Sequence, residues 1–290
     1  MINWLLYLVV VLIWGSTWLA IKWQLGIVAP EISIFYRFAT ASLLLIFYCL
    51  LRRINLKFPP KNHLFLFLMG AGMFSLNYIF LYQATFYLIS GLVSVIFSLV
   101  SLFNILNNYL FFKIRPTKFV LSGAALGLCG ISTIFWKDLI HISFQDQILI
   151  GIGLALIATL VFSFGNIASR YNQLQGMRLV SSTAIAMGYG VLIMLAYIWL
   201  NDIPFSWSNE WKYVGSLFYL AVPGSIVAFL CYLSLISRIG INRAGYATVF
   251  FPVIALLFSF FAESYQWHLT DFVGIGTVIL GNLLIMTRFD

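Results

Sequence analysis

The sequence predicts an all-α polytopic membrane protein with ten transmembrane helices, and three observations lead to this fold class. Of its 290 residues, 62% are apolar and only 8% are charged, whereas a soluble chain carries roughly 25% charged residues. The mean hydropathy is +1.01. The apolar residues fall into stretches of about 20 residues, the length that an α-helix needs to cross a bilayer. This pattern excludes a soluble, disordered or fibrous protein.

The expected helices are separated by short connections that contain helix breakers and charged residues. They cover residues 3–23, 32–51, 64–86, 91–112, 118–136, 148–169, 179–200, 211–236, 244–262 and 269–287. The breakers include Pro30, Pro59, Pro116, Gly176 and Gly240, which are residue types that end or redirect a helix. Because the first four residues lack the basic region of a signal peptide, the first stretch is expected to remain as a helix.

Positive charge divides the connections into two alternating sets. Twelve of the 16 Lys and Arg residues fall in one set and only three, Lys22, Lys137 and Lys212, in the other. Seven of the eight acidic residues fall in the set with few basic residues. Basic residues collect in cytoplasmic loops, so both termini are predicted to be cytoplasmic. The net charge of +8 is interpreted as an orientation signal, and no nucleic-acid partner is expected. The twelve basic residues are Arg52, Arg53, Lys57, Lys61, Lys113, Arg115, Lys118, Arg170, Arg178, Arg238, Arg243 and Arg288.

The two halves of the chain correspond to each other, with residues 11–22 parallel to residues 159–170. Five helices per half is an odd number, so the second half enters the membrane from the opposite side. Such an inverted repeat is the architecture of many secondary transporters, which bind their substrates between the halves. The repeats are expected over residues 1–140 and 147–290. Chance similarity between apolar helices is the alternative.

Motifs in several expected helices carry a family resemblance. They are Trp14-Gly15-Ser16-Thr17 with Lys22, Arg37-Phe38, Asn77-Tyr78, Tyr82-Gln83-Ala84, and Arg243-Ala244 through Pro252 to Glu263. On these residues the sequence resembles the EamA type of the drug/metabolite transporter superfamily over nearly its whole length. The resemblance implies ten helices in two inverted five-helix repeats, and transport, often export, of amino acids or other metabolites. Two features depart from the family: the fourth helix lacks a counterpart of Pro252, and it ends in Phe111-Phe112-Lys113 where the family usually has Leu-Gly-Glu.

Polar side chains form a stripe along the helix predicted over residues 91–112. The stripe consists of Ser94, Ser98, Ser101, Asn104 and Asn108, whose spacing places them on one face. Amides are costly in hydrocarbon, so this face is expected to meet protein or water. It is either a cavity wall that offers hydrogen bonds to a polar solute, or a surface that hydrogen-bonds to neighbouring helices.

Two other faces are predicted to form symmetric walls of a cavity. One carries Thr159, Ser163, Asn166 and Arg170, and the repeat-related face carries Val11, Gly15, Trp18 and Lys22. Trp14 and Trp18 lie far from the membrane interfaces, where an indole either stacks on a planar or cationic group or packs in the core.

Three cations are candidates for an electrostatic or gating role. Lys22 and Arg170 end the two symmetric faces, where they either attract an anionic or carboxylate-bearing substrate or extend to the interface. Arg37 lies within the helix of residues 32–51 and has no acidic residue three or four positions away. Since an unpaired buried charge is costly, it is expected to reach a carbonyl group, an acidic residue of an outer loop, or the cavity.

No Asp or Glu lies in the middle of an expected helix. A proton relay through a buried carboxylate is therefore not expected, and neither is an enzyme with paired carboxylates and a metal. The three histidines lie in different loops and the three cysteines are far apart, so no metal or other cofactor is expected. Gly123 and Gly127 form a GxxxG motif, which serves either dimerisation or packing within the chain.

The sequence therefore predicts a transporter and not an enzyme. It is expected to export small metabolites, amino acids or similar zwitterionic or neutral solutes, by alternating access in the cytoplasmic membrane. Its expected partners are a small-molecule substrate and the lipid bilayer, with the chain acting as a monomer or weak homodimer. A membrane-embedded enzyme and a non-transporting assembly subunit are the alternatives. The candidate substrate-binding residues are Trp14, Trp18, Asn77, Tyr78, Tyr82, Ser98, Ser101, Asn104, Asn108, Ser163, Asn166, Tyr232 and Tyr246.

Overall fold

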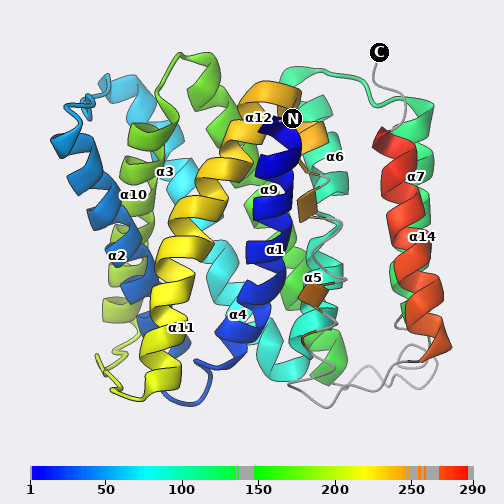
Figure 1. The fold of residues 1–290 in the computed structure, drawn as a ribbon, viewed down its shortest axis with the longest axis horizontal. Helices are drawn as coiled ribbons and strands as arrows, with labels where there is room; N and C mark the ends of the chain where they lie inside the picture. Colours follow the sequence, from blue (N-terminus) through cyan, green and yellow to red (C-terminus); the bar gives the residue numbers. More distant parts are fainter. Residues whose placement is uncertain are drawn as a thin grey trace.

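The computed structural model describes residues 2–134, 136, 147–245, 247–248, 254–255, 258 and 268–286. Within these residues the secondary structure is helical, with no strand (Figure 1). Seven helical segments of this part are long and apolar enough to cross a membrane, and two shorter apolar helices cover Leu121–Ile134 and Leu269–Gly281. The span predicted over residues 244–262 lies mostly outside the described residues, so the total of ten remains a prediction.

The helices of the first half follow the predicted stretches with small shifts at their ends. They are α1 (Ile2–Lys22), α2 (Pro30–Leu51), α3 (Pro60–Phe74), α4 (Leu76–Tyr87), α5 (Ser90–Phe97), α6 (Val100–Phe112) and α7 (Lys118–Ile134). Prolines occupy the first position of α2 and α3, where the missing N–H is not needed and the fixed φ suits a helix.

The second half contains α9 (Gln147–Leu174), α10 (Leu179–Leu200), α11 (Trp211–Ala221), the π-helix η1 (Val222–Val227), α12 (Ala228–Ala244) and α14 (Leu269–Met286). Gly176, with a φ of +73°, lies between α9 and α10. A left-handed residue of this kind commonly ends a helix, and glycine adopts it without steric penalty.

Three spans that the sequence predicts as continuous helices are interrupted near the middle of the bundle. Ser75 separates α3 from α4, and its hydroxyl lies 3.2 Å from the carbonyl oxygens of both Gly70 and Ala71. A second interruption separates α5 from α6 at residues 98–99. The third is η1, which contains Pro223. Proline has no N–H to donate, so it disrupts the regular helical ladder at this point.

Small residues allow some helices to approach closely. Gly72 of α3 meets Gly165 of α9, since a Cβ added to Gly72 would lie 2.7 Å from the Cα of Gly165. Likewise, a Cβ on Gly281 of α14 would lie 3.0 Å from the backbone nitrogen of Gly127 in α7. The backbone of the GxxxG motif therefore contacts a helix of the same chain, whereas a Cβ on Gly127 itself would meet nothing within 4 Å, so both interpretations stay open.

The long helices run between two ends of the bundle. The α2–α3, α6–α7 and α9–α10 connections lie at the end that carries the N-terminus (Figure 1). Six of the twelve basic residues of the rich set lie in these connections, and Lys61 and Lys118 lie in the first turns of the helices that follow two of them. The side of the membrane that this end faces remains a prediction from charge.

Candidate functional site

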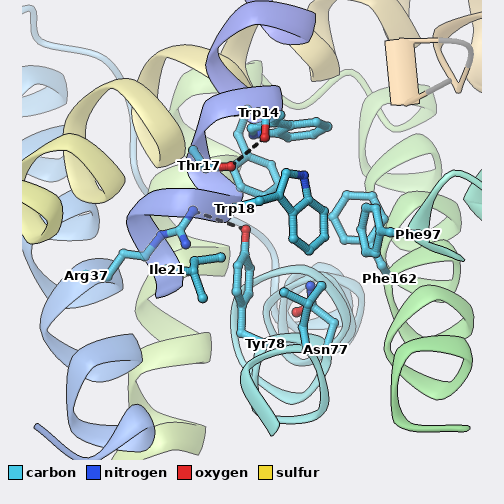
Figure 2. A pocket seen from close by; sticks show the side chains of 11 residues that line it. Trp14, Thr17, Trp18, Ile21, Arg37, Asn77, Tyr78, Phe97 and Phe162 are labelled. Carbon is cyan, nitrogen blue, oxygen red and sulfur yellow. Dashed lines mark hydrogen bonds between the residues drawn. The ribbon is translucent and has the colours of Figure 1, made fainter. Parts of the chain in front are cut away.

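A small cavity lies inside the bundle, enclosed by α1, α2, α4, α5, α9 and α12 (Figure 2). Its volume is about 30 Å³, which is space for a water molecule or two. A metabolite would enter only if the surrounding helices moved apart. The lining residues are Trp14, Thr17, Trp18, Ile21, Arg37, Asn77, Tyr78, Leu81, Phe97, Phe162 and Phe229.

Arg37 supplies the positive charge of this cavity. Its Nε donates a hydrogen bond to Ser225 Oγ at 2.8 Å, and its Nη2 donates to the Tyr78 hydroxyl at 3.2 Å. The guanidinium carbon lies 4.6 Å from the centre of the Tyr78 ring, close enough for a cation–π interaction. Arg37 is only 1% exposed, and its Nη1 is buried with no hydrogen-bond acceptor. Arg37 was expected to reach a carbonyl group, an outer-loop acid or the cavity. In the structure it lies at the cavity and is held by two hydroxyls.

Ser225 reaches Arg37 from the π-helix η1. Its hydroxyl donates to the carbonyl oxygen of Leu220, five residues earlier, at 2.8 Å. It is thereby oriented to accept from Arg37. The wider turn also leaves the carbonyl of Gly224 to accept a hydrogen bond of 3.2 Å from Trp14 Nε1. π-Helical turns often occur at functional sites, and this one joins α1 and α2 to the second half of the chain.

Asn77 lies in the first turn of α4, directly after the interruption at Ser75. Its side chain is fully buried, and neither its amide nitrogen nor its amide oxygen has a hydrogen-bond partner. Buried amides are nearly always hydrogen-bonded, because an unmet polar group is costly. The start of α4 also brings the partial positive charge of a helix N-terminus to the cavity. In Figure 2, Tyr78 stands between Arg37 on one side and Asn77 on the other.

Aromatic rings form the remaining wall. Trp14 packs on Phe229 and Tyr232, with ring centres 5.0 and 4.9 Å apart. Trp18 packs on Phe97 at 5.7 Å. Both indoles are therefore core residues and cavity-lining residues at once, so the two interpretations of these tryptophans are compatible.

Other predicted residues form a separate hydrogen-bonded cluster that does not line the cavity. Asn104 Oδ1 accepts from Ser163 Oγ at 2.9 Å and from Asn166 Nδ2 at 3.1 Å. Asn166 Nδ2 also donates to the Tyr232 hydroxyl at 3.1 Å, and Asn107 Nδ2 donates to Ser163 Oγ at 2.9 Å. We call these five residues the amide cluster. It ties α6 to α9 and α12, so Asn104 of the stripe bonds between helices in this conformation.

The serines of the stripe bond within their own helices. Ser94, Ser98 and Ser101 donate to the carbonyl oxygens of the residues three positions earlier, at 2.6, 2.6 and 3.1 Å. Asn108 Nδ2 donates to Asn242 Oδ1 at 3.2 Å. None of these four residues lines the cavity.

Three further candidates also lie away from the cavity lining. Tyr82 donates to Gln24 Oε1 at 2.9 Å, and Lys22 Nζ donates to the carbonyl oxygen of Thr85 at 3.0 Å. The guanidinium carbon of Arg170 lies 6.0 Å from the centre of the Phe112 ring. Tyr246 lies outside the described residues.

The sequence analysis missed several residues of the site. Phe162 could have been found, because it occupies the position in the second repeat that corresponds to Trp14. Pro223, inside a predicted span, could have indicated the interruption that places Ser225. No comparable signal pointed to the others, which are Thr17, Ile21, Leu81, Phe97 and Phe229.

Comparison with known proteins gives consistent matches along the chain. Residues 1–136 and 149–287 match the EamA-like transporter family. An uncharacterized transporter of Archaeoglobus fulgidus is 25% identical, with 99% of each chain covered. The uncharacterized transporter YoaV of Bacillus subtilis is 25% identical over 95% of this chain and 91% of its own. The uncharacterized inner membrane transporter YedA of Escherichia coli is 28% identical over 94% of this chain and 87% of its own. One crystal structure, 17% identical, shares the fold with a TM-score of 0.75 over 99% of both chains.

Proposed function

The chain belongs to the EamA-like transporter family, and from this membership we propose that it moves small metabolites across the cytoplasmic membrane by alternating access. It is a multi-pass membrane protein. The proposed substrates are amino acids or similar zwitterionic or neutral solutes, and the proposed direction is export. The observation that carries the proposal is a small cavity that Arg37, Asn77 and Tyr78 line together with apolar and aromatic side chains. Sites for small molecules combine such apolar walls with a few placed polar groups.

The interrupted helices around the cavity support alternating access. Interruptions at Ser75 and at η1 lie directly beside residues that line the cavity or hold Arg37. Transporters of inverted-repeat architecture commonly bind their substrates at such discontinuous helices and move one repeat against the other. The short elements α4, α5 and η1 supply places where the wall can move without unfolding a whole span.

The amide cluster is proposed to close the cavity toward the end of the bundle that carries the N-terminus. Asn166 lies four residues after Phe162 along α9, one helical turn nearer to that end. Tyr232 joins the cluster to the cavity wall, since its hydroxyl bonds to Asn166 while its ring packs on Trp14. Opening on this side would break hydrogen bonds between α6, α9 and α12.

The driving force is proposed to be the gradient of the substrate itself or its exchange for another solute. The lining residues of the described part include no carboxylate and no imidazole, which are the groups that usually relay protons in transporters. Family membership and a mainly apolar cavity that contains a few polar groups together favour a transporter over a membrane-embedded enzyme or an assembly subunit. The chain is proposed to work as a monomer or weak homodimer, since the backbone of its GxxxG motif contacts Gly281 while a Cβ on Gly127 would meet nothing within 4 Å.

Transport by purified protein in liposomes tests the proposal. We expect counterflow of at least one solute from a panel of radiolabelled amino acids, nucleosides and sugars. Trp18→Ala removes the ring that packs on Phe97 at the cavity, so we expect transport to fall about tenfold or more. Trp4→Ala is the matched control, because Trp4 is 71% exposed on the outer surface of α1. If no solute of the panel moves, the proposed function is wrong.

A further inference from the structure

The cavity holds one full positive charge that no lining residue balances. Arginine stays protonated in proteins, and the lining residues of the described part include no acidic side chain. The neighbours of the Arg37 guanidinium are the hydroxyls of Ser225 and Tyr78 and the rings of Tyr78 and Phe38. Burying a charge without a counter-ion is costly. The cavity therefore favours an anionic group over a neutral or cationic one.

One nitrogen of the Arg37 guanidinium has no hydrogen-bond partner. Nη1 of Arg37 carries two N–H groups, is buried, and donates to no acceptor. A carboxylate matches the fork of a guanidinium better than any neutral acceptor does. The hydroxyls of Ser225 and Tyr78 hold the other two nitrogens, so the fork is fixed before a ligand arrives.

Asn77 supplies a second unused group on another wall. Its amide oxygen and nitrogen are both buried without partners, so this side chain can accept from or donate to a ligand. An amide is neutral, and its oxygen can accept from a hydroxyl as well as from an ammonium group. Nothing among the lining residues thus demands a positively charged group on the ligand.

We propose that the site selects solutes by their carboxylate, which binds Nη1 of Arg37. A hydroxyl or amino group beside the carboxylate binds the Asn77 amide, and a branched or aromatic body packs on Trp14, Trp18, Phe97 and Phe162. The inference rests on the proposed function and changes its substrate class. The carboxylate is required, which excludes neutral solutes, whereas the ammonium of an amino acid is replaceable, which admits anionic ones.

A series of related compounds tests this selectivity on the unmodified protein. The probes are phenylalanine, 3-phenyllactate, 3-phenylpropionate, phenylalaninamide and phenethylamine, together with the matching leucine series. Binding is measured by tryptophan fluorescence of the purified protein, and transport by competition in proteoliposomes. We expect phenylalanine and phenyllactate to bind within about fivefold of each other. The amide and the amine, which lack the carboxylate, should bind at least about tenfold more weakly.

Variants at Arg37 separate charge from packing. Arg37→Gln should weaken the binding of carboxylates about ten- to hundredfold. It should also abolish the preference for phenylalanine over phenylalaninamide. Arg37→Lys keeps the charge but loses the fork, so the preference should persist with lower affinity. Arg178→Gln is the control, because Arg178 is exposed in the connection between α9 and α10.

Asn77→Leu gives a readout that a purely structural role would not produce. Replacing an unpartnered buried amide by an apolar side chain should raise thermal stability. The same change should weaken phenylalanine and phenyllactate about two- to tenfold and leave 3-phenylpropionate unchanged. This variant keeps the proposal testable even if Arg37→Gln does not fold.

The outcomes distinguish the inference from the proposed function. If the protein moves solutes but takes amides or amines as readily as carboxylates, the inference is wrong and the transport function stands. If the carboxylates of the phenylalanine series and of the leucine series both fail to bind while other solutes are carried, the inference is likewise overturned. If no solute of any class is moved, the proposed function falls as well.

Discussion

At the residue scale, the site is built from polar groups that are only partly satisfied. Arg37 bonds through two of its three nitrogens, and the Asn77 amide has no partner. Both residues are almost completely buried. Leaving such groups unmet lowers stability, which is a common feature of sites arranged for a ligand rather than for packing.

Ser225 and Ser216 form a matched pair for measuring what holds Arg37. Ser225→Ala removes the acceptor of the Arg37 Nε hydrogen bond, so we expect stability to fall by about 1–3 kcal/mol, typical for bonds to a charged group. Ser216 is also buried, but its hydroxyl donates to the carbonyl of Tyr213 in its own helix. Thermal unfolding should show a clearly smaller loss for Ser216→Ala. Equal losses would mean that the Ser225 bond contributes nothing specific.

At the element scale, the position of each helix depends on contacts at a few close approaches. Helix α9 passes near the centre of the bundle and contacts α3, α4, α5 and α6. It meets α3 through Gly165 and meets α6 through the amide cluster. The first contact is steric and the second is polar, and the two can be perturbed separately.

Two glycines of α9 should respond to alanine with opposite signs. A Cβ on Gly165 would lie 2.9 Å from the backbone nitrogen of Met73, whereas a Cβ on Gly153 would meet nothing within 4 Å. Gly153→Ala should raise stability by up to about 1 kcal/mol, because alanine is the better helix former. Gly165→Ala should lower it, because α3 and α9 must separate. Thermal unfolding in detergent measures both, and a gain at Gly165 would contradict this packing.

Tyr232→Phe isolates the polar contact between α9 and α12. The change removes the hydroxyl that accepts from Asn166 but keeps the ring that packs on Trp14. We expect a loss of about 0.5–1.5 kcal/mol in thermal stability. Tyr109→Phe, at a 39% exposed position on α6, should have little effect. A change in transport rate at unchanged substrate affinity would support a role of the amide cluster in closing the cavity.

At the scale of the whole molecule, charge predicts the orientation in the membrane. The three described connections that hold six of the twelve basic residues lie at the end that carries the N-terminus (Figure 1). Basic residues are retained on the cytoplasmic side during insertion. The predicted orientation therefore rests on charge alone, independently of the site.

Labelling of single cysteines tests this orientation. In a chain without Cys49, Cys129 and Cys231, Asn55→Cys lies in the α2–α3 connection and Asn209→Cys in the α10–α11 connection, both exposed. We expect a membrane-impermeant maleimide on intact cells to label position 209 and not position 55. Labelling of both positions after the membrane is permeabilised is the control. The reverse pattern would show the opposite orientation.

The positions of the helices were predicted better from the sequence than the contacts between their side chains. Most helical spans of the described residues were predicted within four residues, but α9 extends to Leu174 and α12 to Ala244, beyond the predicted ends at residues 169 and 236. Arg37, Asn77, Tyr78 and the two tryptophans were all named as candidates. The interruptions at Ser75 and η1 were not predicted, because each span remains apolar throughout and periodicity does not register a local change of hydrogen-bond partner. Nor could spacing show that Asn104 and Asn166 bond to each other rather than line the cavity.

The sequence by itself determined that this is a multi-pass membrane protein of the EamA-like family with asymmetric loop charge. Apolar length and charge position act locally along the chain, so they are readable without knowledge of the packing. Only the tertiary structure decided which polar side chains share the cavity. A polar group in a bilayer must find its partner on another helix, and for Arg37 that partner, Ser225, lies 188 residues away in the sequence. The pairing depends on how the helices pack, and it left Nη1 of Arg37 and the Asn77 amide free for a ligand.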